Sequence, residues 1–273
     1  FILESGIRLF NNIFENISGG PAVNEEQNLY NNLYTNEKGS AIYARNFSPK
    51  FINAKLSVDI DHNTGQGTPH FNHCTKAVVT YNTNTSILHA KVLNTGAGFL
   101  NGMMEGRKYR MEYNTLNNVI KGMEFVGNNS YGSFVKDNVI MLPPTLPWAI
   151  GSTNESYTPV GISLKRLTPY YTANFDILNN QVIIPCEGGI GIDLQNTGFL
   201  VRIEENQIQH TCTNTGGVPY TDVPLFNGIR LVNAFRTSVK LNTITGNNTT
   251  LNYYGDNAAV RMVKSPGLQL YCN

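Results

Sequence analysis

The sequence predicts an all-β fold of the β-solenoid class, in which short strands stack in repeated turns of the chain. Three observations lead to this prediction. Apolar and polar residues alternate in short runs between Gly189 and His210, which is the period of half-buried strands. A Gly-aliphatic-Xaa-aliphatic phrase recurs along the chain, and so does an Asn-Xaa-aliphatic triplet. Repetition of this kind, with polar turns of a few residues between strands, is typical of solenoid proteins.

The glycine phrase sets the expected register of the core. It occurs at Gly6, Gly161, Gly191 and Gly228, and the aliphatic residues that follow each glycine are expected to face inward. Two successive turns then place aliphatic side chains in stacked columns, namely Ile162, Leu164, Phe175, Ile177 and Val182 against Ile192, Leu194, Val201, Ile203 and Ile208.

The asparagine triplet marks a second repeated position, at Asn118, Asn138, Asn180, Asn206 and Asn242. The chain adds long segments after Met141 and after His210, whereas the other turns stay short, so loop insertions are expected along one edge of the solenoid. Residues 20–40 are polar and irregular and read as a loop, with at most one helical turn. The register between residues 41 and 110 is less regular than later in the chain.

Composition and charge limit the number of domains and the kinds of function that the chain can have. The 273 residues are 41% hydrophobic with no break in composition, which favours one elongated unit spanning residues 1–273. The net charge of +1, without a basic block, gives no footprint for nucleic acid. The sequence has no apolar run long enough to span a membrane. Both ends read as interrupted strands, so we expect a segment of a longer chain whose remainder packs against it.

Three short strands per turn, with Gly opening one strand and Asn closing another, resemble the right-handed parallel β-helix of the pectin-lyase-like superfamily. The resemblance is clearest over residues 109–273. It implies a right-handed parallel β-helix with loop insertions along one edge. Asn-rich repeats of this kind are similar to those of large secreted or cell-surface bacterial proteins and of some phage tail proteins, which implies an extracellular or cell-surface location.

The third residue of each Gly-aliphatic-Xaa-aliphatic phrase must point outward, because it lies between two aliphatic residues that point inward. This predicts a surface column of Arg8, Glu124, Ser163, Asp193, Arg230 and Arg261. Asp193 and Arg230 fall on neighbouring strands and could pair. Nearby loops carry Trp148, Tyr157, Tyr220, Asp222, Tyr253 and Asp256. The column and loops predict a carbohydrate-binding groove, in which aromatic rings stack on sugars and charges hold hydroxyls; the alternative is a solvated face with an ordinary surface ion pair.

Catalysis on this kind of fold requires clustered carboxylates with a base. The tight acidic groups are Asp59 and Asp61 with His62, and Glu204 with Glu205. None of them resembles the polygalacturonase motifs. Asp59 and Asp61 could bind calcium, but a solvated strand end is the simpler interpretation, and Glu204 and Glu205 read as a solubilising turn.

Four cysteines and two nearby histidines complete the candidates. His70, His73 and Cys74 lie close in sequence, but no second cluster at ligand spacing completes a metal site. Cys186 and Cys212 each follow a triplet asparagine by six residues, so they share a phase and could form a disulfide or a close pair of thiols; two buried side chains that never touch remain the alternative. Cys74 and Cys272 are expected to be free.

These observations predict a non-catalytic extracellular module, structural or adhesive, that presents loops to a glycan or a surface protein. No cofactor is expected, with calcium as an open possibility. The alternative function is that of a polysaccharide lyase or glycoside hydrolase of the pectin-lyase-like superfamily, which would require a compact set of carboxylates with a base on one face.

Overall fold

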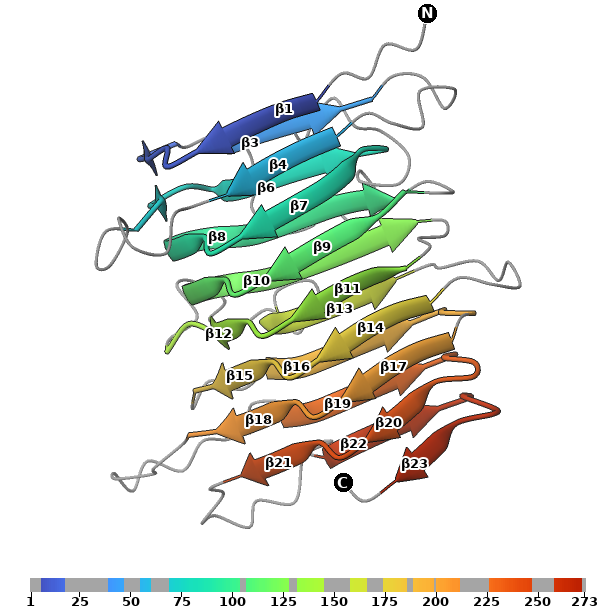
Figure 1. The fold of residues 1–273 in the computed structure, drawn as a ribbon. Coiled ribbons are helices and arrows are strands. Elements are labelled where there is room, and N and C mark those ends of the chain that lie inside the picture. Colours follow the sequence, from blue (N-terminus) through green and yellow to red (C-terminus); the bar gives the residue numbers. More distant parts are fainter. Residues whose placement is uncertain are drawn as a thin grey trace, which may run out of the picture.

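The computed structural model describes residues 6–17, 39–46, 55–59, 69–103, 107–127, 132–144, 158–165, 174–185, 189–198, 200–211, 226–246 and 258–271. Within these ranges the protein is all-β, and every strand pair that we describe below is parallel. The chain runs down the molecule in successive passes, each lying next to the one before it (Figure 1).

The first strand of each pass belongs to sheet A, which has nine strands. These are β1 (Gly6–Phe10), β4 (Lys55–Asp59), β7 (Asn84–Leu88), β9 (Tyr109–Glu112), β11 (Ser133–Lys136), β14 (Asn174–Leu178), β17 (Leu200–Glu204), β20 (Ser238–Lys240) and β23 (Gln269–Tyr271).

Sheet B has fourteen strands in two arms, which join at two long strands, β8 (Lys91–Met103) and β10 (Thr115–Gly127). The short arm also contains β2 (Phe14–Glu15), β5 (Phe71–Asn72), β12 (Val139–Met141), β15 (Gln181–Ile184), β18 (Gln207–His210) and β21 (Thr243–Gly246). The long arm also contains β3 (Ser40–Arg45), β6 (Lys76–Tyr81), β13 (Val160–Lys165), β16 (Gly189–Gln195), β19 (Phe226–Val232) and β22 (Ala258–Val263).

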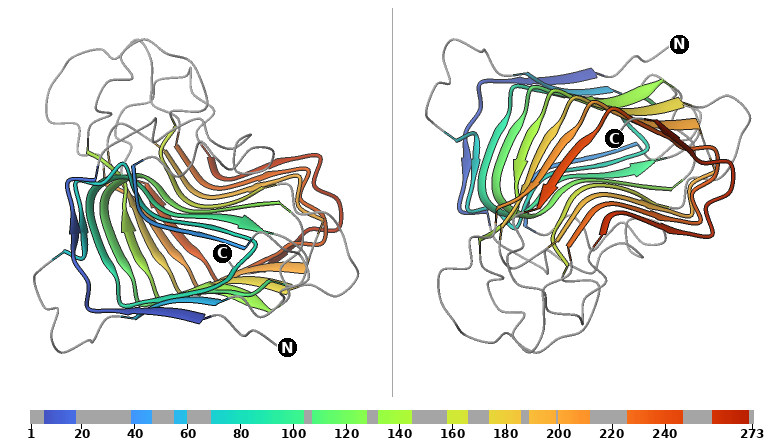
Figure 2. Two further views of the ribbon diagram at one scale, coloured as in Figure 1. Left: turned by 90° about the horizontal axis from the view of Figure 1, so that it is seen from above. Right: turned by 90° about the horizontal axis from the view of Figure 1, so that it is seen from below.

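Viewed along the stack, sheet A and the two arms form three sides around a common interior (Figure 2). The predicted columns fill this interior. Ile162 pairs with Ile192, Phe175 with Val201 and Val182 with Ile208, and all ten predicted core residues are buried. Aromatic rings cross between the sheets, since Phe125 of the long arm meets Tyr109 and Phe175 of sheet A edge-on, at 5.8 and 5.0 Å between ring centroids. The prediction of an all-β fold with aliphatic side chains stacked inside it is confirmed. Most passes have three strands, but the passes that contain β8 and β10 have two, since each of these long strands runs through both arms.

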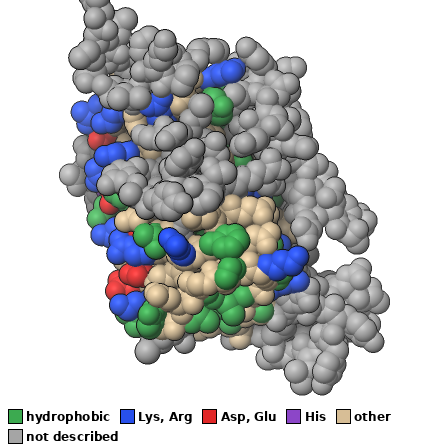
Figure 3. All heavy atoms as spheres, turned by 90° about the vertical axis from the view of Figure 1, so that its right-hand side faces the viewer, with side chains coloured by type: hydrophobic (Ala, Val, Ile, Leu, Met, Phe, Trp, Pro, Cys, Tyr) green, Lys and Arg blue, Asp and Glu red, His purple; other side chains and the backbone are tan. Residues whose placement is uncertain are grey.

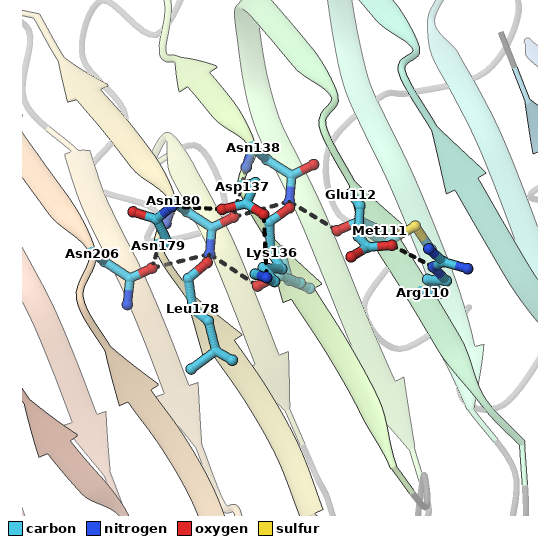
Figure 4. A network of polar contacts seen from close by, with 11 residues as sticks. Arg110, Met111, Glu112, Lys136, Asp137, Asn138, Leu178, Asn179, Asn180 and Asn206 are labelled. Carbon is cyan, nitrogen blue, oxygen red and sulfur yellow. Dashed lines mark hydrogen bonds and ion pairs between the residues drawn. The ribbon is translucent and has the colours of Figure 1, made fainter. Parts of the chain in front are cut away.

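Buried asparagines form a ladder where sheet A turns into the short arm. Its members are Asn114, Asn138, Asn180, Asn206 and Asn242, of which Figure 4 shows Asn138, Asn180 and Asn206. Each of the first four donates both its backbone N–H and its side-chain Nδ2 to Oδ1 of the next asparagine, over 2.9 to 3.1 Å. Nδ2 also donates to backbone carbonyls of its own and the preceding pass, as Asn206 does to Glu204 and Ile177.

The first member of the predicted ladder was wrong. Asn118 does not belong to it; its Nδ2 donates to Asn94 Oδ1 at 2.7 Å, and its backbone is left-handed with φ of 57°. Asn114, followed by Thr115 and Leu116, is the true member. The residue before each ladder asparagine also has positive φ, which asparagine and aspartate tolerate well but which costs Tyr113 about 1 kcal/mol or more.

Gly6 was also misplaced, because its phrase belongs to sheet A and not to the long arm. Arg8 consequently pairs in register with Ser57 and forms an exposed ion pair with Asp59 at 3.0 Å. Ile7, the aliphatic residue that follows Gly6 and was expected to face inward, is 61% exposed. Arg8 therefore leaves the predicted outward column, because the same four-residue phrase occurs on two different sheets.

The other phrase glycines are required by close backbone packing. A Cβ on Gly191 would lie 2.6 Å from the carbonyl oxygen of Gly228 and 2.7 Å from Ile208 Cγ2. Gly161 and Gly228 face equivalent contacts with the next pass. Glycine at this position lets the start of each long-arm strand lie against the next one.

We expect Gly191→Ala to lower the free energy of unfolding by about 1 to 3 kcal/mol, because backbone atoms cannot move aside as a flexible side chain does. Gly6→Ala is the matched control, since a Cβ there meets nothing within 4 Å. Urea unfolding of both variants measures the difference. Equal stability of the two variants would contradict the packing role of Gly191.

Candidate functional site

The outward face of the long arm holds most of the predicted site. Register places Glu124 beside Ser163, Ser163 beside Asp193, Asp193 beside Arg230 and Arg230 beside Arg261. Apart from Arg8, the predicted register of the column is confirmed, but Glu124, Ser163, Asp193 and Arg230 are buried and do not form the predicted surface. Toward the start of the chain the column continues through apolar positions, with Leu100, Val79 and Tyr43 packed in a small cluster of their own.

Asp193 and Arg230 form a bidentate ion pair. Nε and Nη2 of Arg230 each donate to one oxygen of Asp193 at 2.8 Å, and Gln195 Nε2 donates to Asp193 Oδ2 at 2.8 Å. The side chains of Asp193 and Arg230 are 0% and 10% exposed. The expectation of a solvated surface pair was thus wrong, and removal of either partner would leave a buried charge.

Glu124 forms the second ion pair of this face, with Lys121 Nζ 3.2 Å from its Oε2. Burial alone would raise the pKa of Glu124, but the charges of Lys121 and Lys165 and the hydrogen bond from Lys121 together hold this pKa below its ordinary value. Glu124 is therefore a carboxylate at neutral pH.

Three buried polar groups on the same face make no hydrogen bond. They are Glu124 Oε1, Ser163 Oγ and both side-chain polar atoms of Asn227. Buried polar atoms without partners are uncommon in native proteins, and each usually marks a water, an ion or a ligand. Because Glu124 and Ser163 lie on neighbouring strands, their unpartnered oxygens give the face hydrogen-bonding capacity that the described residues do not use.

Sequence reasoning missed Lys121, Lys165 and Asn227. Strict alternation from Met123 would put Lys121 inside, but its ammonium group reaches outward-facing Glu124. The alternation therefore breaks at the intervening glycine, Gly122. Asn227 occupies the equivalent position before Gly228, so the residue before each phrase glycine was the available signal.

Several predicted site residues lie outside the described residues. These are Trp148, Tyr157, Tyr220, Asp222, Tyr253 and Asp256, together with the pair Cys186 and Cys212 and with Cys272. Arg261 is described and lies next to Arg230 in the column.

The acidic candidates that the structure describes, Asp59, Glu204 and Glu205, lie at strand ends and in a turn. Asp59 is the last residue of β4 and pairs with Arg8, whereas Asp61 and His62 lie outside the described residues. Glu204 ends strand β17, and Glu205 alone occupies the turn, with φ of 59°.

Of the histidine and cysteine candidates, His70 and Cys74 are both buried. His70 is buried, and its Nδ1 accepts the Lys91 N–H at 3.0 Å; burial, aided by the charge of Lys91, lowers its pKa. Cys74 is a free thiol, as predicted, and burial raises its pKa. Over the described ranges, no three His, Cys, Asp or Glu side chains gather as metal ligands.

No family model matches this chain, and no curated protein or solved structure matches it significantly. Among the described residues no helix is long and apolar enough to cross a membrane.

Proposed function

We propose that this chain is a right-handed parallel β-helix that acts as a non-catalytic binding module, extracellular or at a cell surface. It presents the outward face of the long arm and the adjoining loops to a glycan or a surface protein. Parallel strands that recur in three-sided passes support the β-helix. Right-handedness follows the general rule for crossover connections between parallel strands.

One observation carries the functional proposal: the buried carboxylates of this face are each held by a cation, while neighbouring polar groups have no partner. Asp193 is held by Arg230 and Glu124 by Lys121. A glycoside hydrolase needs one carboxylic acid with a raised pKa to protonate the leaving group, and the pKa of Glu124 is lowered instead. Ser163 Oγ is buried and has no hydrogen-bond partner, which leaves it a donor and an acceptor for the hydroxyl of a ligand that enters this face.

The test compares Ser163→Ala with Ser238→Ala in titrations against neutral and uronic-acid oligosaccharides. Ser163 Oγ makes no hydrogen bond in the protein, so its removal should leave the fold intact and weaken binding about 2- to 10-fold, the value of one hydrogen bond. Ser238 lies on sheet A and should have no effect. Unchanged affinity in Ser163→Ala would contradict the long-arm site.

The alternative, a polysaccharide lyase or hydrolase, is tested on the same panel. Incubation with uronic-acid and neutral polysaccharides should release no product. Product release that Asp193→Ala abolishes, in a variant whose circular dichroism remains that of the parent, would establish catalysis and overturn the binding-only proposal.

A further inference from the structure

The short arm presents a second face with a different chemistry. Five tripeptides stack there in register, Thr115–Asn117, Val139–Met141, Gln181–Ile183, Gln207–Gln209 and Thr243–Thr245. The middle residue of each points into the core, and the two outer residues are exposed or half-buried. We call the ten outer side chains the neutral stripe.

None of the ten side chains is ionisable. Sheet A provides an internal comparison, because the same passes carry outward charges there, among them Arg110, Glu112, Asp176, Arg202 and Lys240. Lys, Arg, Asp and Glu side chains follow one another down the left-hand side of Figure 3, which is the sheet A side. Two faces built from the same passes thus differ in charge.

The size of the neutral stripe limits what can occupy it. Five strands spaced ~4.8 Å apart give a length of about 19 Å, and two outward positions on one strand are about 7 Å apart. The resulting area is on the order of 150 to 300 Å², whereas a stable protein partner covers about 800 Å². A second copy of this chain is therefore too broad, and a narrow linear ligand fits.

The side chains define the chemistry of that ligand. Gln181, Gln207 and Gln209 offer amides that make no side-chain hydrogen bond within the described residues. An amide both donates and accepts, and so does a sugar hydroxyl. Met141 and Ile183 lie in the outward column of Gln209, next to the column of Gln181 and Gln207, and offer apolar surface for the C–H faces of a sugar.

We propose that the neutral stripe binds a chain of uncharged polysaccharide lying along the stack. This site is separate from the long-arm face and does not depend on the function proposed for it. Since no charge takes part, binding should be insensitive to salt and should exclude acidic polysaccharides.

Affinity electrophoresis in native gels tests the proposal. Gels contain hydroxyethylcellulose or galactomannan as neutral probes, polygalacturonate as the acidic probe, or no polymer as the reference. We expect at least one neutral polymer to retard the protein, equally at low salt and after equilibration with about 0.3 M NaCl. Retardation by polygalacturonate alone, or by no polymer, would overturn the proposal.

Gln207→Glu combined with Gln209→Glu should abolish this retardation, because the carboxylates lose the donors of the amides and repel each other. Ser86→Glu combined with Ser238→Glu is the control: it adds the same charge to outward positions of sheet A and should leave retardation unchanged. Thermal unfolding confirms that both variants are folded. If retardation persists in the Gln207→Glu, Gln209→Glu variant but is lost in Ser163→Ala, the neutral stripe is not the binding site and the long-arm face is supported instead.

Discussion

Replacement of Asn206 by aspartate should unfold the protein at neutral pH or remove more than about 4 kcal/mol of its stability. Asn206 Nδ2 donates to the carbonyls of Ile177 and Glu204 and to Asn242 Oδ1, and all three are acceptors. A carboxylate cannot donate to them and would be buried among oxygens. The cost therefore combines lost hydrogen bonds with an uncompensated buried charge.

The pH dependence of Asn206→Asp identifies this cause. Burial raises the pKa of the introduced carboxyl above its value in the unfolded chain. The variant is then least impaired in acid, below about pH 4, and its deficit relative to the parent grows as the pH rises toward the raised pKa. Urea unfolding between pH 4 and 7 measures this trend.

Asn179→Gly is the matched control for the ladder. Asn179 is the exposed neighbour of the ladder residue Asn180, and its φ of 50° suits glycine. Its replacement should change stability by less than about 1 kcal/mol. A deficit in Asn206→Asp that is small, or independent of pH, would refute the structural role of the ladder.

Ile203→Asp should have a comparable effect through the apolar core. Ile203 is fully buried and lies in register between Ile177 and Val239 of sheet A. The substitution loses roughly 1.5 to 3 kcal/mol of apolar burial and places a carboxylate without a cation in the interior. The sum approaches the whole stability of a typical domain, so we expect no folded protein.

Leu200→Asp controls for the chemical change itself. Leu200 lies on the same strand but is 51% exposed, so aspartate there should be tolerated. Circular dichroism and limited proteolysis of the two purified variants distinguish the outcomes. A folded Ile203→Asp variant would show that the assigned register of sheet A is wrong.

The sequence allowed prediction of the core because the period of two is enforced at every buried strand. Ile192, Leu194 and Ile203 face inward as expected, since a shift by one residue would expose each of them. The pattern did not place the Gly6 phrase on the correct sheet, because a glycine followed by two alternating aliphatic residues fits a strand of sheet A as well as one of the long arm. It also failed at Asn118, where two asparagines only four residues apart, Asn114 and Asn118, each precede an aliphatic residue at the required distance.

The candidate site was predicted only in part, because alternation determines which side of a strand a residue faces but not its depth. Asp193 and Arg230 were correctly paired from their phase, yet their burial changes the pair from a minor surface contact into a fixed part of the structure. Strict alternation alone puts Lys121 on the wrong side, because the alternation breaks at Gly122.

The asparagine ladder gives the molecule an electrical direction. From Asn114 to Asn206, each Nδ2 donates to Oδ1 of the asparagine in the next pass, so the amide-to-amide hydrogen bonds all run in one direction. The same Nδ2 atoms also donate to a backbone carbonyl of the preceding pass. The amide dipoles therefore point the same way and polarise one another, as peptide dipoles do in an α-helix, in a region from which water is excluded. A charged group that approaches along the axis of the stack would meet a different potential at each end.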